Sequence, residues 1–268
     1  MGENTKIEWT AYRGIDGALH PGFTFNPWIG CTKVSPACDG CYAENLMAHR
    51  YGRVNWGPGE DRQRTSVANW RKPVAWDRDA KAAGTRPYVF CASLADVFDN
   101  EVDEMWRADL FKLIDATPNL IWLLLTKRIG NVRKMTDPER GNPCLPRNVA
   151  IGATIANQEE YDRDRMKLWE VKEMREPLFT FGSFEPLLGR IVLDKYAPDW
   201  IIAGGETDQG SHKARHTDTE WFRYLRDQSQ ALGRAFFMKQ MSKKGPIPAD
   251  LLVRQWPEAT LMTEIGND

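Results

Sequence analysis

The stretch Leu120-Ile-Trp-Leu-Leu-Leu-Thr126 is a continuous apolar run that ends on a threonine. A run of this length and composition predicts a strand that is buried on both faces, as in a parallel sheet. Similar short runs lie on both sides of it along the chain and alternate with segments of helical character. The other predicted strands are 23–29, 88–93, 149–154, 177–182, 200–205 and 235–240. The predicted helices are 42–51, 72–81, 104–116, 129–135, 159–172 and 218–232.

This alternation predicts βαβ units and therefore a parallel sheet. About six or seven such units favour an α/β fold, a full or partial (β/α) TIM-like barrel, with a doubly wound open sheet as the alternative. A chain of 268 residues fits one barrel domain over 1–268. We expect an irregular N-terminal lead-in at 1–21 and a C-terminal cap at 242–268.

The composition excludes several classes of protein. With 42% apolar residues the chain can bury a sizeable core, and its net charge of -1 means that a nucleic-acid partner has to be met by a local basic surface. The polar stretch Met1–Lys6 lacks the apolar core of a signal peptide. No apolar run reaches the roughly 18 residues of a membrane helix. We therefore expect a cytoplasmic protein with no membrane association.

Three of the five cysteines lie in one stretch, Cys31-Thr-Lys-Val-Ser-Pro-Ala-Cys-Asp-Gly-Cys41. Because cytoplasmic thiols stay reduced, this grouping indicates metal ligation or catalysis rather than disulfides. Three thiolates can bind three irons of a [4Fe–4S] cluster and leave the fourth iron open. The alternatives are a structural zinc site with His49 as the fourth ligand, a redox pair in the C-x2-C part, and no metal.

The position of these cysteines favours the cluster. They follow the first predicted strand and precede the first predicted helix. In a (β/α) barrel this places them on the face where the loops from strand to helix form the active site. A structural zinc site has no such preference for one face.

A three-cysteine loop after the first strand of an α/β barrel resembles the radical S-adenosylmethionine (SAM) superfamily. The usual spacing there is C-x3-C-x2-C, and this chain departs from it with C-x6-C-x2-C. More closely, the chain resembles a phage and bacterial family that is labelled by its three-cysteine motif. The matching pieces are Lys6–Thr10, Asn26–Cys31, Cys41–Glu44, Leu124–Arg128, Glu185–Gly189, Gly204–Glu206 and Phe237–Gln240.

The resemblance implies a [4Fe–4S] cluster at Cys31, Cys38 and Cys41, with SAM bound to the open iron. Reductive cleavage of SAM then gives a 5′-deoxyadenosyl radical that abstracts a hydrogen from the substrate. The implied reaction is isomerisation of an amino-acid-modified thymidine in phage DNA, from N-linked to C-linked glycine. The partners are DNA carrying that thymidine and a reductant such as flavodoxin or ferredoxin, in the cytoplasm of the host cell. The alternatives are another radical SAM substrate (a DNA lesion, a nucleoside or a peptide) and a zinc-stabilised, non-catalytic nucleic-acid-binding protein.

Polar residues at the predicted strand ends are the candidate ligands of SAM. Ser93 and Asp96 follow the second strand, where the superfamily usually binds the SAM amino group; for Asp96 a helix cap or a solvated acid is the alternative. Thr126, Lys127 and Arg128 follow the third strand, and a cation there would hold the SAM carboxylate or a DNA phosphate. We take Lys127 as a candidate catalytic residue, with a surface pair at a helix start as the alternative.

Thr154, Asn157 and Gln158 follow the fourth predicted strand and suit ribose hydroxyls, although Asn157 is also a good helix cap. Glu185 and Glu206 follow the fifth and sixth strands and would face one pocket.

We take the two glutamates as candidate catalytic residues that bind an amine or move protons. The alternative is a pair of structural carboxylates bound to Arg190 or Lys239.

Two loops mix positive charge with other functional groups. Tyr51–Arg71 contains several arginines and tryptophans, which suits stacking on single-stranded or flipped bases. Thr207–Thr217 contains histidines, a lysine and an arginine, which suits phosphate contact. The alternatives are an ordinary lid for the first loop and solvated surface for the second.

Overall fold

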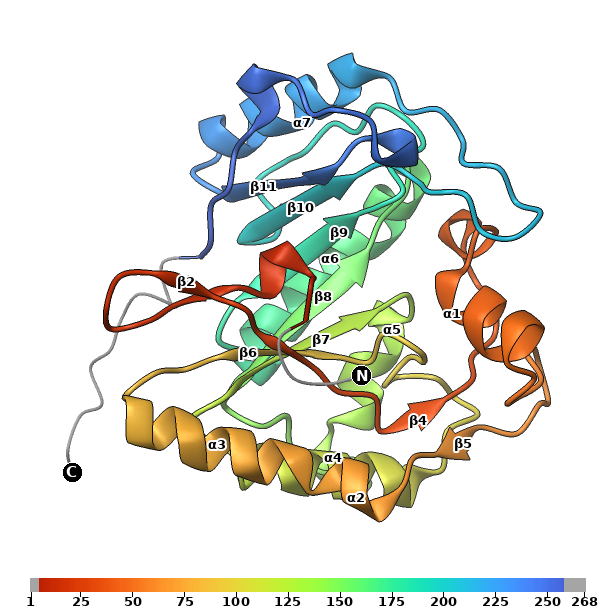
Figure 1. Ribbon diagram of the computed structural model, residues 1–268, viewed down its shortest axis with the longest axis vertical. Coiled ribbons are helices and arrows are strands. Elements are labelled where there is room, and N and C mark those ends of the chain that lie inside the picture. The colour runs from red at the N-terminus through yellow and green to blue at the C-terminus, as the bar shows by residue number, and fades with distance from the viewer. Residues whose placement is uncertain (1–4, 258–268) are drawn as a thin grey trace.

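The computed structural model describes residues 5–257 and is organised around one seven-stranded sheet (Figure 1). Neighbouring strands run parallel throughout, in the order β3-β6-β7-β8-β9-β10-β11. The strands are β3 (Phe23–Thr24), β6 (Tyr88–Cys91), β7 (Ile121–Thr126), β8 (Val149–Thr154), β9 (Thr180–Phe184), β10 (Trp200–Gly204) and β11 (Ala235–Gln240).

The strand order decides between the two predicted architectures. Each strand lies beside the sheet strand that precedes it in the chain, whereas a doubly wound sheet reverses its order at a switch point. In the described part of the chain, β3 and β11 remain at opposite edges of the sheet, which curls without closing. The predicted α/β fold is therefore confirmed as a partial (β/α) barrel, and the doubly wound alternative is wrong.

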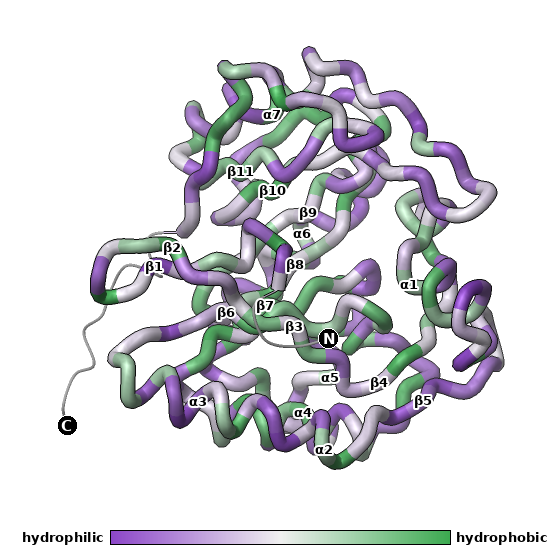
Figure 2. Tube along the Cα trace, viewed as in Figure 1, coloured by the Kyte–Doolittle hydropathy of each residue, from purple (hydrophilic) through white to green (hydrophobic). Residues whose placement is uncertain are grey.

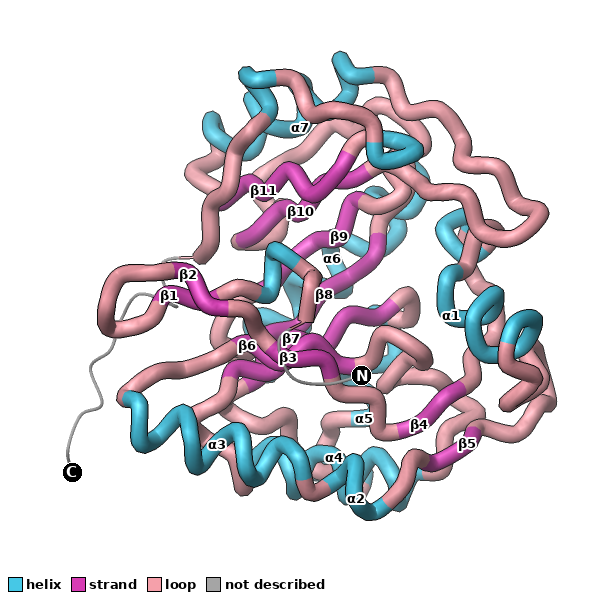
Figure 3. Tube along the Cα trace, viewed as in Figure 1, coloured by secondary structure: helices cyan, strands magenta, loops and turns pink. Residues whose placement is uncertain are grey.

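Each predicted helix is present, and the longer ones pack on one side of the sheet (Figures 1 and 3). They are α3 (Lys72–Ala83), α4 (Glu104–Asp115), α5 (Ile129–Met135), α6 (Gln158–Arg175) and α7 (Thr219–Ala231). Two short helices precede them, α1 (Tyr42–Glu44), which continues as the π-helical turn η3 (Asn45–Arg50), and α2 (Val67–Trp70).

The strand β7 shows why these runs are apolar throughout. Trp122 and Leu124 belong to the core formed with the helices, while Ile121 and Leu123 belong to a second core on the inner side of the sheet. All four side chains are at most 2% exposed. Burying each contributes about 1.5–3 kcal/mol, so both faces of the strand stabilise the fold. Figure 2 shows green, hydrophobic stretches along the sheet, whereas the loops at the rim of the molecule are largely purple.

The N-terminal segment fills the inside of the partial barrel. Its short helix η1 (Glu8–Thr10) inserts Trp9, which is 4% exposed, into the inner core. The Trp9 ring lies 4.8 Å from Phe90, 6.0 Å from Trp200 and 6.3 Å from Phe181, centroid to centroid. A hairpin of β1 (Tyr12–Arg13) and β2 (Leu19–His20) follows. The lead-in is thus more ordered than its composition predicts, and it is part of the core.

The first predicted strand, 23–29, is divided in two. Its start is β3 in the main sheet, and its end is β4 (Trp28–Ile29), which pairs antiparallel with β5 (Gln63–Arg64). Pro27 lies between them and has no N–H to donate to a ladder. The division turns the chain out of the sheet and into the loop that carries the cysteines.

The C-terminal part consists of two short 3-10 helices, η5 (Ser242–Lys244) and η6 (Ala249–Leu251). A bridge between Arg254 and Phe237 holds this part against β11. The rest of the predicted cap, 258–268, lies outside the described residues. None of the helices between residues 5 and 257 combines the length and the apolar character that a membrane crossing requires.

Gly152 on β8 offers a test of the inner core. A Cβ at this position would lie 2.3 Å from Cε2 of the buried Phe181, whose ring is held in place by Trp9 and Trp200. We predict that Gly152→Ala lowers the free energy of unfolding by about 1–3 kcal/mol, measured by urea denaturation.

The matched control is Gly130→Ala, because Gly130 is exposed in α5 and its Cβ would meet only Lys167, at 3.5 Å. This variant should be neutral or more stable by about 0.4–1 kcal/mol. Equal destabilisation by both variants would contradict the packing described here.

Candidate active site

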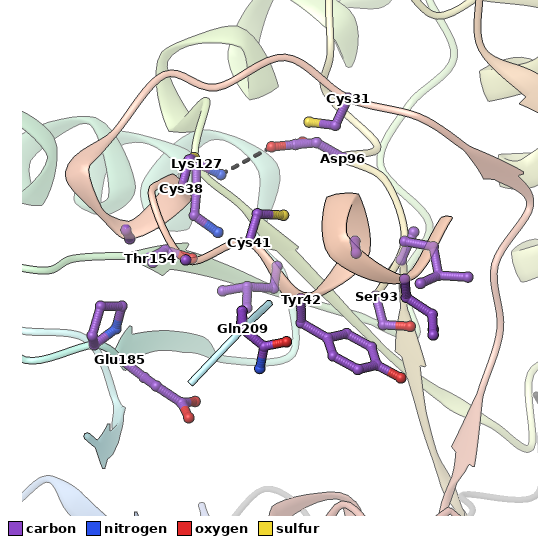
Figure 4. A pocket seen from close by; sticks show the side chains of 18 of the residues that line it. Cys31, Cys38, Cys41, Tyr42, Ser93, Asp96, Lys127, Thr154, Glu185 and Gln209 are labelled. Carbon is purple, nitrogen blue, oxygen red and sulfur yellow. Dashed lines mark hydrogen bonds between the residues drawn. The ribbon is translucent and has the colours of Figure 1, made fainter. Parts of the chain in front are cut away.

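A cavity of about 910 Å³ lies at the edge where the parallel strands end (Figure 4). Its wall combines the cysteine loop, which we define as residues 31–41, with residues that follow β6, β7, β8, β9 and β10. This is the edge at which (β/α) barrels carry their active sites. The predicted site residues that line it are Cys31, Cys38, Cys41, Ser93, Asp96, Thr126, Lys127, Thr154, Glu185 and Glu206.

The cysteine loop is shaped by two local caps. Ser35 caps the 3-10 helix η2 (Pro36–Cys38), and its Oγ accepts a hydrogen bond from the Ala37 N–H at 3.0 Å. The Sγ of Cys41 caps α1 by accepting from the Glu44 N–H at 3.5 Å. Serine is a preferred residue at the N-cap of a helix. The two caps turn the loop back toward the cavity.

Burial controls the chemistry of the thiols. It raises the pKa of Cys31 to about 11, with a further contribution from Asp96. Burial also raises the pKa of Cys41, although the Glu44 N–H and the nearby Lys127 ammonium oppose it. The raised pKa values of Cys31 and Cys41 favour their protonated forms, and a bound metal has to displace those protons.

The remaining cysteines and His49 lie elsewhere. Cys91 is fully buried in the core, Cys144 is exposed, and neither lines the cavity. His49, the fourth ligand in the zinc alternative, has a 69% exposed side chain whose Nε2 lies 4.0 Å from Glu44 Oε1. Between residues 5 and 257, no three His, Cys, Asp or Glu side chains are grouped around the position of one metal ion.

Asp96 is buried and its carboxylate is already bound by the protein. Its Oδ1 accepts from the Thr126 hydroxyl at 2.7 Å and from the Phe98 N–H at 2.9 Å. Its Oδ2 accepts from the Lys127 N–H at 3.0 Å and from Arg128 Nη1 at 3.2 Å. With four donors in place, Asp96 ties the ends of β6 and β7 together, which differs from the predicted contact with the SAM ammonium.

Arg128 holds the first cysteine. Its Nη1 lies 3.5 Å from Cys31 Sγ and its Nη2 donates to the Thr32 carbonyl at 2.8 Å. The side chain is 9% exposed and pairs with Asp96 at 3.2 Å and Asp99 at 3.6 Å. The guanidinium thus binds the cysteine loop to the sheet, whereas the sequence predicted a contact with the SAM carboxylate.

Two arginines of the loop Tyr51–Arg71, Arg62 and Arg64, serve the architecture. Arg62 has a 1% exposed side chain, donates to both Asp99 Oδ2 and Thr32 Oγ1 at 2.8 Å, and contacts Glu101. Arg64 lies 4.3 Å above the Trp70 ring. These groups are therefore not free to stack on bases.

Several polar groups in the cavity wall remain without protein partners. The hydroxyls of Thr24 and Thr154 are buried and have no hydrogen-bond partner in the described part of the chain. The half-buried Lys127 ammonium has no ion pair among the described residues. Ser93 differs, because its hydroxyl is bonded to the Asn26 carboxamide at 3.0 Å.

Asn157 and Gln158 do not line the cavity. The Asn157 Oδ1 accepts from the Glu160 N–H at 2.9 Å and caps α6. The Gln158 Oε1 accepts from the Val192 N–H at 2.6 Å. Asn157 therefore follows the capping alternative, and neither residue is placed to bind ribose hydroxyls.

The two candidate glutamates are both paired. Glu185 accepts from Lys239 Nζ at 2.8 and 2.5 Å, as the structural alternative predicts, whereas Arg190 lies 3.7 Å above the Tyr224 ring. The pair faces the cavity, since both of its members line it.

Glu206 is bound by Arg215 at 2.7 Å, and His212 Nε2 lies 3.1 Å from its Oε2. Although burial alone would raise its pKa, hydrogen bonds from Arg215 hold the pKa of Glu206 at about 2. A general acid or base works best with a pKa near the working pH, so Glu206 is unsuited to move protons at neutral pH.

Sequence reasoning missed three contributors to the site. Lys6 and Ile7 of the lead-in line the cavity. Asn26 is 1% exposed and also accepts from the Leu94 N–H at 2.8 Å, which sets the backbone after β6. All three belong to the pieces Lys6–Thr10 and Asn26–Cys31 that carry the resemblance, so that resemblance was the available sign of their role.

Comparison with solved structures finds a likeness to a double mutant of spore photoproduct lyase with bound AdoMet and dinucleoside spore photoproduct. The two proteins are 12% identical, the match covers 86% of this chain, and the TM-score is 0.46. The chain spans 59% of the length of that protein chain. No curated protein matches the sequence significantly.

A family model matches residues 4–255, which is nearly the whole chain. The family is described as "Protein of unknown function (DUF5131)". The match includes every cavity residue named above. The chain therefore belongs to the DUF5131 family.

Proposed function

We propose that this protein is a radical SAM enzyme that binds a [4Fe–4S] cluster through Cys31, Cys38 and Cys41. The observation that carries the proposal is that these three thiols line one cavity at the strand ends of a parallel partial barrel. No other cysteine of the described chain lines it. Three thiolates suit a cluster that keeps one iron for a ligand, so the donor set fits this cofactor.

The unpartnered Thr154 hydroxyl provides a second sign that the cavity binds a ligand. Buried polar groups in proteins are nearly always hydrogen-bonded, so a buried hydroxyl that faces a cavity without a partner indicates a missing ligand atom. We propose that Thr154 binds SAM and that Lys127 holds an anionic group of SAM or the substrate. When bound, the reduced cluster supplies the electron that cleaves SAM to a 5′-deoxyadenosyl radical.

We propose as substrate an amino-acid-modified thymidine in DNA, whose glycine is moved from an N-linked to a C-linked attachment. The sequence resemblance supports this choice, and the cavity volume of about 910 Å³ leaves room beyond one small ligand. Three lysines of the wall have no ion pair within residues 5–257 and suit phosphates; they are Lys6, Lys127 and Lys244. A flavodoxin or ferredoxin is the proposed reductant, because the chemistry needs an external electron.

The cluster is tested by anaerobic purification and reconstitution. We expect a brown protein with broad absorbance near ~400 nm and about four irons per chain. Replacing any of Cys31, Cys38 or Cys41 by Ala should abolish the absorbance and the formation of 5′-deoxyadenosine. Cys144→Ala is the matched control and should behave as wild type, because Cys144 is exposed and outside the cavity. A colourless protein with one zinc would instead support the nucleic-acid-binding alternative.

Thr154→Val tests whether the unpartnered Thr154 hydroxyl binds SAM. The change keeps the side-chain shape and removes a buried polar group that has no protein partner, so stability should be unchanged or higher. The lost hydrogen bond to SAM should weaken SAM binding by roughly 3–10-fold, measured by equilibrium dialysis with reconstituted protein.

Thr180→Val is the matched control, since the buried Thr180 hydroxyl donates to Asp199 Oδ2 at 2.9 Å, away from the cavity. This variant should lose stability and keep its affinity for SAM. The assignment of Thr154 is wrong if the two variants bind SAM equally well.

The substrate is tested by incubating reduced enzyme with SAM and DNA that contains the modified thymidine. We expect 5′-deoxyadenosine and, after digestion of the DNA, a nucleoside isomer of unchanged mass. A nucleoside of altered mass would point to a lyase instead of an isomerase.

A further inference from the structure

Arg215 lies in the long loop between β10 and α7, and the proposed chemistry does not use it. The loop runs out from the sheet toward α1 (Figures 1 and 3). The Arg215 side chain is 31% exposed, which is low for an arginine on a loop. The N–H groups of its guanidinium donate to one carboxylate on the β10 side and to the cysteine loop on the other side.

The carboxylate is Glu206, at the end of β10. Arg215 Nε donates to Glu206 Oε2 at 2.9 Å, its Nη2 donates to Oε1 at 2.7 Å, and its backbone N–H donates to Oε2 at 2.9 Å. The side-chain contacts form the bidentate geometry that arginine makes with carboxylates and lysine cannot. Glu206 has a 5% exposed side chain, so it is a fixed anchor.

The same guanidinium reaches the cysteine loop on both sides of Cys38. Its Nη1 donates to Asp39 Oδ2 at 2.9 Å, and its Nη2 donates to the Pro36 carbonyl at 2.9 Å. Gly40 also packs closely against side chains of the other loop, because a Cβ on Gly40 would lie 2.6 Å from His212 Cδ2 and 2.9 Å from Glu206 Oε1. Arg215 therefore lies where the two loops meet.

This contact connects distant parts of the sheet. The cysteine loop follows β3 at one edge, and β10 lies next to the opposite edge. Because the barrel does not close, strand pairing cannot hold these two ends at a set distance. Arg128, which follows β7, holds the loop at Cys31, and in the described part of the chain it forms no hydrogen bond or ion pair with residues 36–41. The second half of the loop depends on the β10 side.

We propose that Arg215 is a positioning residue that fixes the segment Pro36–Cys41, with Glu206 as its anchor, so that Cys38 and Cys41 are held ready to bind the cluster. The inference rests on the proposed function as far as the cluster is concerned. Arg215 itself does not line the cavity. The two arginines then divide the loop, with Arg128 at its first cysteine and Arg215 at the other two.

The test compares Arg215→Ala, Arg215→Lys and Glu206→Gln with the control Arg223→Ala. Arg223 also binds two carboxylates, Glu220 and Asp250, and none of these three residues lines the cavity. The first readout is hydrogen exchange of iron-free protein over residues 36–41. Loss of charged hydrogen bonds should make this segment exchange roughly tenfold faster or more in both Arg215 variants, with Arg223→Ala unchanged.

The second readout is the cluster, measured as iron per chain and as the visible and electron paramagnetic resonance spectra after reconstitution. We expect both Arg215 variants to lose iron and to show an altered spectrum. Arg215→Lys should not restore the iron content, because lysine cannot make the bidentate contact with Glu206. The double variant of Arg215→Ala with Glu206→Gln should lose no more iron per chain than Arg215→Ala alone, since the two residues act as one unit.

Wild-type exchange over 36–41 together with full iron content in Arg215→Ala would overturn the proposal, as would the same losses in Arg223→Ala. If Arg215→Ala does not fold, Arg215→Lys and Glu206→Gln test the proposal instead, by hydrogen exchange over residues 36–41 and by iron content. If wild-type protein binds no cluster, the proposed function fails, and the exchange measurement still decides whether Arg215 fixes the loop.

Discussion

The structure depends on a buried set of alternating charges behind the cysteine loop. Asp96 binds Arg128 at 3.2 Å, Arg128 lies 3.6 Å from Asp99, and Asp99 binds Arg62 at 2.8 Å. None of these side chains is more than 9% exposed. Buried charges are costly unless each is paired, and removal of one partner typically costs about 3–5 kcal/mol. The position of the loop is therefore set by charge pairing, which tolerates only one arrangement, and not by apolar packing alone.

This arrangement separates the groups that build the cavity from those that are free to act in it. Most polar side chains at the strand ends are fully engaged, including Asp96 and Glu206. The groups left available in the described part of the chain include the three thiols, the hydroxyls of Thr24 and Thr154, and the ammonium groups of Lys6, Lys127 and Lys244. A site of this kind has few free functional groups and a rigid frame, which suits chemistry carried by a cofactor while the protein supplies position and shielding from water.

The sequence predicted the strands well because each is a short apolar run bounded by polar residues, with β7 as the clearest case. It also placed the thiols and strand-end residues at one edge, since parallel strands bring their ends together. It could not assign partners: Arg128 and Cys31 are 97 positions apart, and Arg215 and Asp39 are 176 apart. Contacts at such separation leave no periodicity in the sequence. The packing of Trp9 into the inner core could not be predicted for the same reason, since Trp9 has no pattern around it.

The insertion of Trp9 into the inner core has a consequence for how the chain folds. Trp9 precedes every strand of the sheet in the chain, yet it packs against Trp200, and its carbonyl accepts a hydrogen bond from the Trp256 indole at 3.2 Å. The inner core is thus completed only by residues far from Trp9 in the sequence, and contacts of such sequence separation slow folding. Until Trp200 and Trp256 have been synthesised, the growing chain exposes the apolar inner side of its sheet, so we expect a nascent-chain chaperone to shield that surface.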